Sequence, residues 1–218
     1  METVSTRPSD ALSSNGLASN GIETSAIIHW NLPSNELVDL AVERGEGSFS
    51  AHQALVTETG DRTGRSPNDK FIVEEESSSS DVNWGNVNVS TTEEVFMGLK
   101  AKVIAYLSEQ QDLFVQDLYC GAEQSERLAI RVINQNAWHS AFARNMFVRP
   151  NEEELANHQT QFVVYHAPHF EADPAVDGVN SKAFVIVHYA RGEVIIGGTK
   201  YAGEIKKSIF SVMNLLLP

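Results

Sequence analysis

The fold class follows from two apolar runs near the middle of the chain, Leu113-Phe114-Val115-Gln116-Asp117-Leu118-Tyr119 and Arg127-Leu128-Ala129-Ile130-Arg131-Val132-Ile133. Both are rich in aliphatic, β-branched and aromatic residues, which is typical of strands. The second run alternates, so that Leu128, Ile130 and Val132 lie on one face of the predicted strand. The two runs therefore predict two strands of a sheet, with a turn between them at residues 120–122.

Apolar residues on either side of these runs predict the remaining elements. Further strands are predicted at residues 54–57, 71–73, 162–165, 183–187 and 194–196. Helical spacing predicts helices over residues 34–44, 92–108 and 136–148, a short helix at 150–154, and a last helix from about residue 203. In the last two long helices we expect the buried residues to be Trp138, Ala141, Phe142, Met146, Ile205, Ile209, Val212, Met213 and Leu216. Because strands and helices mix without strict alternation, the sequence predicts an α/β fold with a mixed β-sheet flanked by helices.

The composition of the 218 residues excludes several classes of protein. The formal net charge is −13 and 42% of the residues are hydrophobic, which is typical of a globular chain. Such an acidic chain is not expected to bind nucleic acid or an anionic membrane surface. We find neither an apolar stretch that could span a membrane nor a secretory signal pattern. The single cysteine, Cys120, fits a reducing compartment, so a cytoplasmic protein is expected.

The two ends of the chain differ in composition from the middle. Residues 1–25 are rich in Ser, Asn, Gly and Thr and predict a mobile tail, followed by a domain over residues 26–218. The last residues, Leu215-Leu216-Leu217-Pro218, are apolar. Such an end is expected either of a terminus that docks on the protein or of a chain cut at a domain boundary.

The first candidate site is the loop over residues 59–70, which contains Arg65 between Gly64 and Ser66. An arginine held in a fixed loop suits a carboxylate, because two parallel N–H groups match two oxygens. The alternative is a surface turn in which Arg65 pairs with Asp61 or Asp69. Spacing alone favours the surface turn.

The second candidate site is the segment over residues 197–207, which joins a predicted strand to the last helix. Its glycines allow the backbone to approach a ligand, and the start of a helix favours anions. Lys206 and Lys207 lie in the first turns of that helix, although they also fit a solvated face.

Other familiar motifs are incomplete. The segment from Gly192 to Lys200 is not a phosphate-binding P-loop, because its lysine is misplaced, and we find no P-loop elsewhere in the sequence. His166 and His169 lack the further ligands of a zinc pattern and favour structural or surface roles. Cys120 favours a buried thiol over a nucleophile, since no histidine partner is identifiable.

Three blocks of the sequence resemble ATP-dependent phosphoenolpyruvate carboxykinase. They are TGRSPNDKF at residues 63–71, RNMFVRP at 144–150 and IGGTKYAGEIKK at 196–207, and they occur in the order of that family. The resemblance covers nearly all of residues 30–218. It implies the N-terminal part of the enzyme, whose active site lies in a cleft against a C-terminal nucleotide-binding domain. The family's P-loop and its metal-binding histidine and aspartate would lie in that second domain, outside these residues.

The resemblance also implies roles for four residues. Arg65 matches the arginine that binds the substrate carboxylate, and Tyr201 matches the tyrosine that lines the substrate and CO2 site. Lys207 matches the lysine that binds the divalent metal, usually Mn2+ with Mg2+ as the alternative, and that approaches substrate and ATP. Lys206 matches its neighbour, which neutralises phosphate charge. One departure is Lys200, where an aromatic residue is expected.

The implied reaction is the gluconeogenic conversion of oxaloacetate and ATP to phosphoenolpyruvate, CO2 and ADP. This lyase reaction, a decarboxylation, requires nucleotide binding and metal binding, so the chain alone is expected to be inactive. The alternative is a stand-alone module that binds a small carboxylate or a partner without catalysis. Continuation of the coding region into a P-loop would favour the enzyme, and a stop codon would favour the module.

Overall fold

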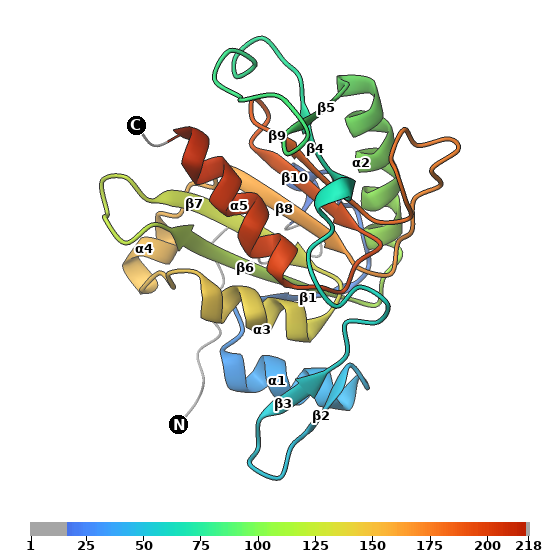
Figure 1. Cartoon of the computed structure of the whole chain (residues 1–218). Coiled ribbons are helices and arrows are strands. Elements are labelled where there is room, and N and C mark those ends of the chain that lie inside the picture. The colour runs from blue at the N-terminus through green and yellow to red at the C-terminus, as the bar shows by residue number, and fades with distance from the viewer. Residues whose placement is uncertain (1–16, 217–218) are drawn as a thin grey trace.

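The structure, a computed structural model, describes residues 17–216 and has an eight-stranded sheet at its centre (Figure 1). The order of the strands across the sheet is β1-β6-β7-β8-β10-β9-β4-β5. Their bounds are β1 Ile27–Trp30, β4 Lys70–Val73, β5 Val89–Thr91, β6 Asp112–Cys120, β7 Leu128–Asn134, β8 Phe162–Ala167, β9 Phe184–His188 and β10 Glu193–Gly197. The pairs β6–β7 and β10–β9 are antiparallel and the other five pairs are parallel. The prediction of a mixed sheet is therefore confirmed.

Helices cover both faces of the sheet, as Figure 1 shows. Helix α2 (Glu93–Ser108) packs on one face, and α3 (Ala137–Met146) and α5 (Gly203–Leu216) pack on the other. Helix α1 (Ser34–Glu43) lies against α3, and the short α4 (Glu152–Ala156) follows α3. A separate hairpin is formed by β2 (Gly47–Phe49) and β3 (Leu55–Thr57), and 3-10 turns lie at Ala18–Asn20 and Pro67–Asp69. None of the helices in residues 17–216 combines the length and apolar character that a membrane span needs.

Alternation along the strands explains why the sheet is covered on both sides. In β10, Val194 and Ile196 pack in the cluster beneath α5, whereas Ile195 packs in the cluster beneath α2. All three side chains are fully buried. A strand buried on both faces is expected in a sheet with parallel pairs, because the connecting helices return across the faces.

The structure differs from the sequence predictions at several positions. Met146 and Leu216 were expected in the core but are 37% and 51% exposed, because each lies at the outer end of its helix. Of the predicted tail, residues 1–16 lie outside the described residues. Residues 17–25 pack against the protein, since Leu17 and Ile22 are fully buried in the core cluster beneath α2.

Candidate functional site

The four residues selected from the sequence lie around one cavity of about 410 Å³. Arg65 comes from the loop before β4, and Tyr201, Lys206 and Lys207 come from the segment that follows β10. The indole of Trp138, on the first turn of α3, forms part of the wall. Two segments far apart in the sequence thus supply one cavity with three cationic side chains.

The loop that carries Arg65 is held by its neighbours and leaves Arg65 itself free. Arg62 binds Asp69 at 2.8 Å and also donates to the hydroxyl of Ser66. The sequence left open a pair between Arg65 and Asp61 or Asp69, but Asp69 pairs with Arg62 instead. Within residues 17–216, the exposed Arg65 has neither an ion pair nor a side-chain hydrogen bond. Its guanidinium is therefore available to an anionic ligand.

The turn between β10 and α5 places Tyr201 and the two lysines. Gly198 has φ +64°, and a Cβ there would lie 2.3 Å from the carbonyl oxygen of Lys182, so only glycine fits. The hydroxyl of Thr199 accepts the backbone N–H of Tyr201 at 3.1 Å, and the helix begins two residues later at Gly203. This turn sets Tyr201 beside the first turns of α5.

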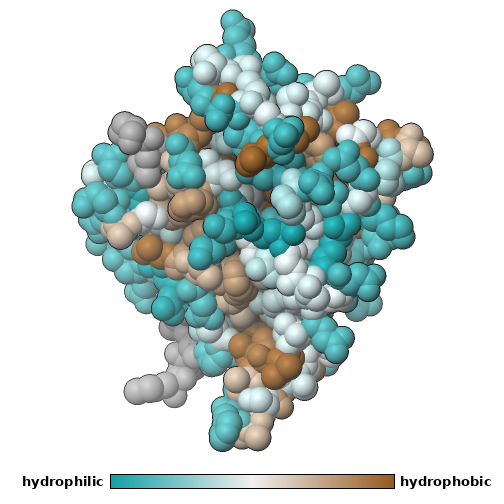
Figure 2. Space-filling view, in the orientation of Figure 1, coloured by the Kyte–Doolittle hydropathy of each residue, from teal (hydrophilic) through white to brown (hydrophobic). Residues whose placement is uncertain are grey.

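Lys206 and Lys207 bring positive charge to the positive end of α5. Lys206 is exposed, and Lys207 is half-buried with Nζ 5.1 Å from the centre of the Phe210 ring. Neither lysine forms an ion pair within the part of the chain that the structure describes. Figure 2 shows a hydrophilic area over the start of α5. Because a helix N-terminus also favours negative charge, this end of the cavity suits an anion.

The buried imidazoles of His139 and His166 support the same turn. The imidazole Nε2 of His139 bonds the carbonyl oxygen of Lys200 at 2.8 Å, and Nε2 of His166 bonds that of Thr199 at 3.2 Å. Their rings meet edge to face with centroids 4.4 Å apart. A carbonyl oxygen only accepts hydrogen bonds, so both Nε2 atoms carry protons. No sequence spacing could reveal this pair, because His139 lies in α3 and His166 in β8.

Burial keeps both rings neutral and makes stability depend on pH. It lowers the pKa of His166 to about 4 and that of His139 well below its usual value of 6.5. Below about pH 6.5 the two imidazoles take up protons in the unfolded chain, whereas burial keeps them neutral in the folded protein. The free energy of unfolding therefore has its full value above about pH 6.5 and is expected to fall as the pH approaches 4. His166 accounts for about 3 kcal/mol of that fall. Urea unfolding at pH 7.0, 6.0, 5.0 and 4.5 measures this loss.

The variant His166→Gln is expected to lose less stability than the wild-type chain over the same pH range. His52→Gln is the control, because His52 is exposed on the hairpin between β2 and β3. Equal pH slopes for His166→Gln and the wild-type chain would contradict the assignment.

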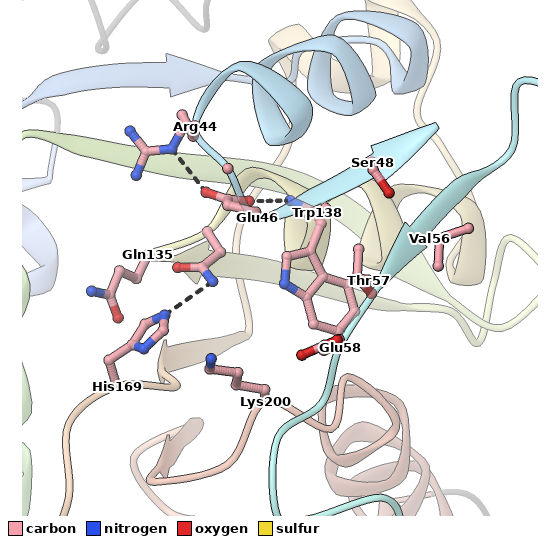
Figure 3. Close-up of a pocket in the computed structure, with 13 residues that line it drawn as sticks. Arg44, Glu46, Ser48, Val56, Thr57, Glu58, Gln135, Trp138, His169 and Lys200 are labelled. Atoms are coloured by element: carbon pink, nitrogen blue, oxygen red, sulfur yellow. Dashed lines mark hydrogen bonds and ion pairs between the residues drawn. The ribbon is translucent and has the colours of Figure 1, made fainter. Parts of the chain in front are cut away.

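A second, more polar cavity of about 570 Å³ lies on the other side of Trp138 (Figure 3). Here Glu46 accepts hydrogen bonds from Arg44 at 2.8 Å and from the backbone N–H of Trp138 at 3.0 Å. Figure 3 shows His169 and Lys200 across the cavity from this carboxylate. The polar groups of Glu46 are occupied within the protein, so this carboxylate caps α3.

Neither cavity carries a complete metal site or an activated thiol. Residues 17–216 contain no cluster of three or more His, Cys, Asp or Glu side chains placed to hold a metal ion. Burial raises the pKa of the Cys120 thiol, which disfavours the reactive thiolate. The cationic side chains of Arg65, Lys206 and Lys207 suit an anionic ligand.

The fold and the first cavity define an α/β domain in which Arg65, Lys206 and Lys207 line one cavity. The family model of phosphoenolpyruvate carboxykinase matches residues 26–218. The chain is 50% identical over 212 residues to phosphoenolpyruvate carboxykinase (ATP) of Geobacter sp. strain M21, covering 97% of this chain and 40% of that protein. The enzymes of the same name from Brevibacillus brevis and Oceanobacillus iheyensis are 51% and 52% identical over 191 residues, covering 88% of this chain and 36% of theirs.

The chain belongs to the phosphoenolpyruvate carboxykinase (ATP) family, as the resemblance predicted. It spans 36–40% of the length of these curated relatives. The relatives' name denotes a carboxy-lyase.

Proposed function

We propose that these residues form the N-terminal part of an ATP-dependent carboxykinase that converts oxaloacetate to phosphoenolpyruvate in gluconeogenesis. The observation that carries the proposal is the cavity where Arg65, Tyr201, Lys206 and Lys207 meet with no ion pair to the three cations within residues 17–216. Arg65 would bind a substrate carboxylate through its paired N–H groups. Tyr201 would line the site of the substrate and of the departing CO2.

The proposed reaction develops negative charge where the cavity is positive. The bond between C3 and C4 of oxaloacetate breaks, CO2 leaves, and the electron pair forms an enolate. The enolate oxygen then attacks the γ-phosphoryl group of ATP, giving phosphoenolpyruvate and ADP. Lys206 would face the phosphate as a fixed cation, whereas Lys207 would act at the enolate oxygen through the metal that its neutral amine would hold.

A divalent metal, Mn2+ or Mg2+, belongs to the proposed reaction and would stabilise the enolate oxygen as a Lewis acid. Lys207 is the one residue of this chain for which we propose metal binding, and a single amine does not make a site. We assign the other ligands and the ATP site to the part of the family's length that this chain does not span. An amine binds a metal only when neutral, so Lys207 would release a proton on binding. A cytoplasmic location completes the proposal.

Titration of the purified chain with phosphoenolpyruvate, followed by two-dimensional NMR, tests the binding part of the proposal. We expect shifts at Arg65, Tyr201 and Lys207. Arg65→Gln is expected to weaken binding by about 10- to 100-fold, since a hydrogen bond to a charged group contributes about 1.5–3 kcal/mol. Arg191→Gln is the control, because Arg191 pairs with Glu93 at the surface.

Two results would contradict this assignment. The first is phosphoenolpyruvate binding that Arg65→Gln leaves unchanged. The second is tight ATP binding by the 218-residue chain, because we place the nucleotide site outside it.

A further inference from the structure

Glu204 is a buried acid at the start of α5 that the proposed reaction does not use. It lies in the first turn of the helix and is only 4% exposed. Its Oε1 accepts the backbone N–H of Ser66 at 2.7 Å. Burying a carboxylate costs free energy unless the group is hydrogen-bonded or paired. The burial of Glu204 therefore calls for a structural explanation.

The surroundings of Glu204 belong to the loop that carries Arg65. Burial raises the pKa of Glu204, and the nearby Arg65 and Lys70 oppose that rise. Ser66, which donates to Glu204, directly follows Arg65 in the sequence. The contact therefore joins the backbone next to Arg65 to the helix that carries the two lysines of the cavity.

Other contacts also hold the loop: Arg62 donates to the hydroxyl of Ser66 within it, and further contacts fix its two ends. Lys70 Nζ donates to the hydroxyl of Ser211 in α5 at 2.8 Å. At the other end, Arg62 donates to the hydroxyl of Ser181 at 2.6 Å. Glu204 is the contact between α5 and the backbone beside Arg65, so the position of Arg65 relative to Lys207 depends on it.

We infer that Glu204 is a positioning residue, which holds the Arg65 loop against α5 so that Arg65 and Lys207 face the same carboxylate substrate. The inference rests on the proposed function for the identity of that substrate. The role belongs to the acceptor oxygen at the end of the side chain. Glutamine keeps that oxygen at the same reach, whereas alanine removes it and aspartate withdraws it by one methylene.

The test compares Glu204→Ala, Glu204→Gln and Glu204→Asp in the purified chain. Amide hydrogen exchange at Ser66 reports the contact directly. We expect exchange to quicken by about tenfold or more in the alanine and aspartate variants and to stay near wild type in the glutamine variant. Amides of β6 and β7 serve as the internal control for an intact fold. If the alanine variant does not fold, the aspartate variant, which keeps the acid, supplies the comparison.

Phosphoenolpyruvate titrations of the same variants test the consequence for binding. Affinity is expected to fall about tenfold in Glu204→Ala and Glu204→Asp and to be kept in Glu204→Gln. Unchanged Ser66 exchange in both shortened variants would overturn the inference, and so would faster exchange with unchanged affinity. A wild-type chain that does not bind phosphoenolpyruvate would refute the proposed function, whereas Ser66 exchange would still decide whether Glu204 fixes the loop.

Discussion

Replacement of Lys207 by methionine is expected to lower phosphoenolpyruvate formation by about 10²- to 10³-fold, the usual effect of removing one fixed group that stabilises transition-state charge. The experiment uses the longer carboxykinase of which we propose this chain is a part. Methionine keeps an unbranched apolar side chain and removes the amine, whose Nζ lies 5.1 Å from the centre of the Phe210 ring. The loss should appear in kcat, because charge on the enolate oxygen develops only during the reaction.

The matched control for this experiment is Lys182→Met. The side chain of Lys182 is exposed and pairs with Glu171. We expect its kcat to stay within about twofold of wild type, since an exposed ion pair contributes little. A Lys207→Met enzyme that melts like wild type and keeps its kcat would remove Lys207 from the proposed mechanism.

Replacement of Asp117 by asparagine is expected to lower the free energy of unfolding by about 3–5 kcal/mol, the range for removing one partner of a buried ion pair. The carboxylate of Asp117 is buried and accepts from Arg131 Nε at 2.7 Å and from a second guanidinium nitrogen at 3.2 Å. The asparagine variant leaves the charge of Arg131 without its partner. Urea unfolding at neutral pH measures the loss.

A double replacement tests whether the lost stability comes from leaving one buried charge without its partner. Apolar residues of similar volume at both positions, Asp117→Leu with Arg131→Met, are expected to recover most of the lost stability, because no uncompensated charge remains. Part of the loss should persist, since the Arg131 guanidinium also lies 4.7 Å from the Trp30 ring. A single Asp117→Asn variant as stable as wild type would show that the ion pair contributes little.

The Asp117–Arg131 ion pair could not be predicted from the pattern of residues along the strands. Alternation in residues 127–133 predicted which side chains share a face, and the structure confirms it for Leu128, Ile130 and Val132, which lie in one cluster. The antiparallel register that sets Asp117 opposite Arg131 depends on the turn between the strands. Local periodicity carries no information on that register, so the pair was missed.

The candidate site shows the same difference between features that depend on neighbouring residues in the sequence and features that depend on contacts between distant segments. The start of the last helix at Gly203 followed from its glycines and its apolar spacing, and the structure confirms it. The meeting of Arg65 with Lys207 depends on β4 lying beside β9 and on β9 lying beside β10. Glu204 escaped notice because an acid in the first turn of a helix is ordinarily explained by the helix dipole at the surface.

The order of strands in the sheet also sets the order in which the newly made chain can fold. Strands β6 and β7 are neighbours in sequence and can pair as soon as both are synthesised. Strand β4 pairs with β5 and, through Lys70 opposite Val185, with β9, which is made much later. At about 5–20 residues per second, this delay is on the order of ten seconds. During that time the apolar strand Phe71-Ile72-Val73 has an edge that β9 does not yet cover. We expect the nascent chain to depend most on molecular chaperones at this stage of synthesis.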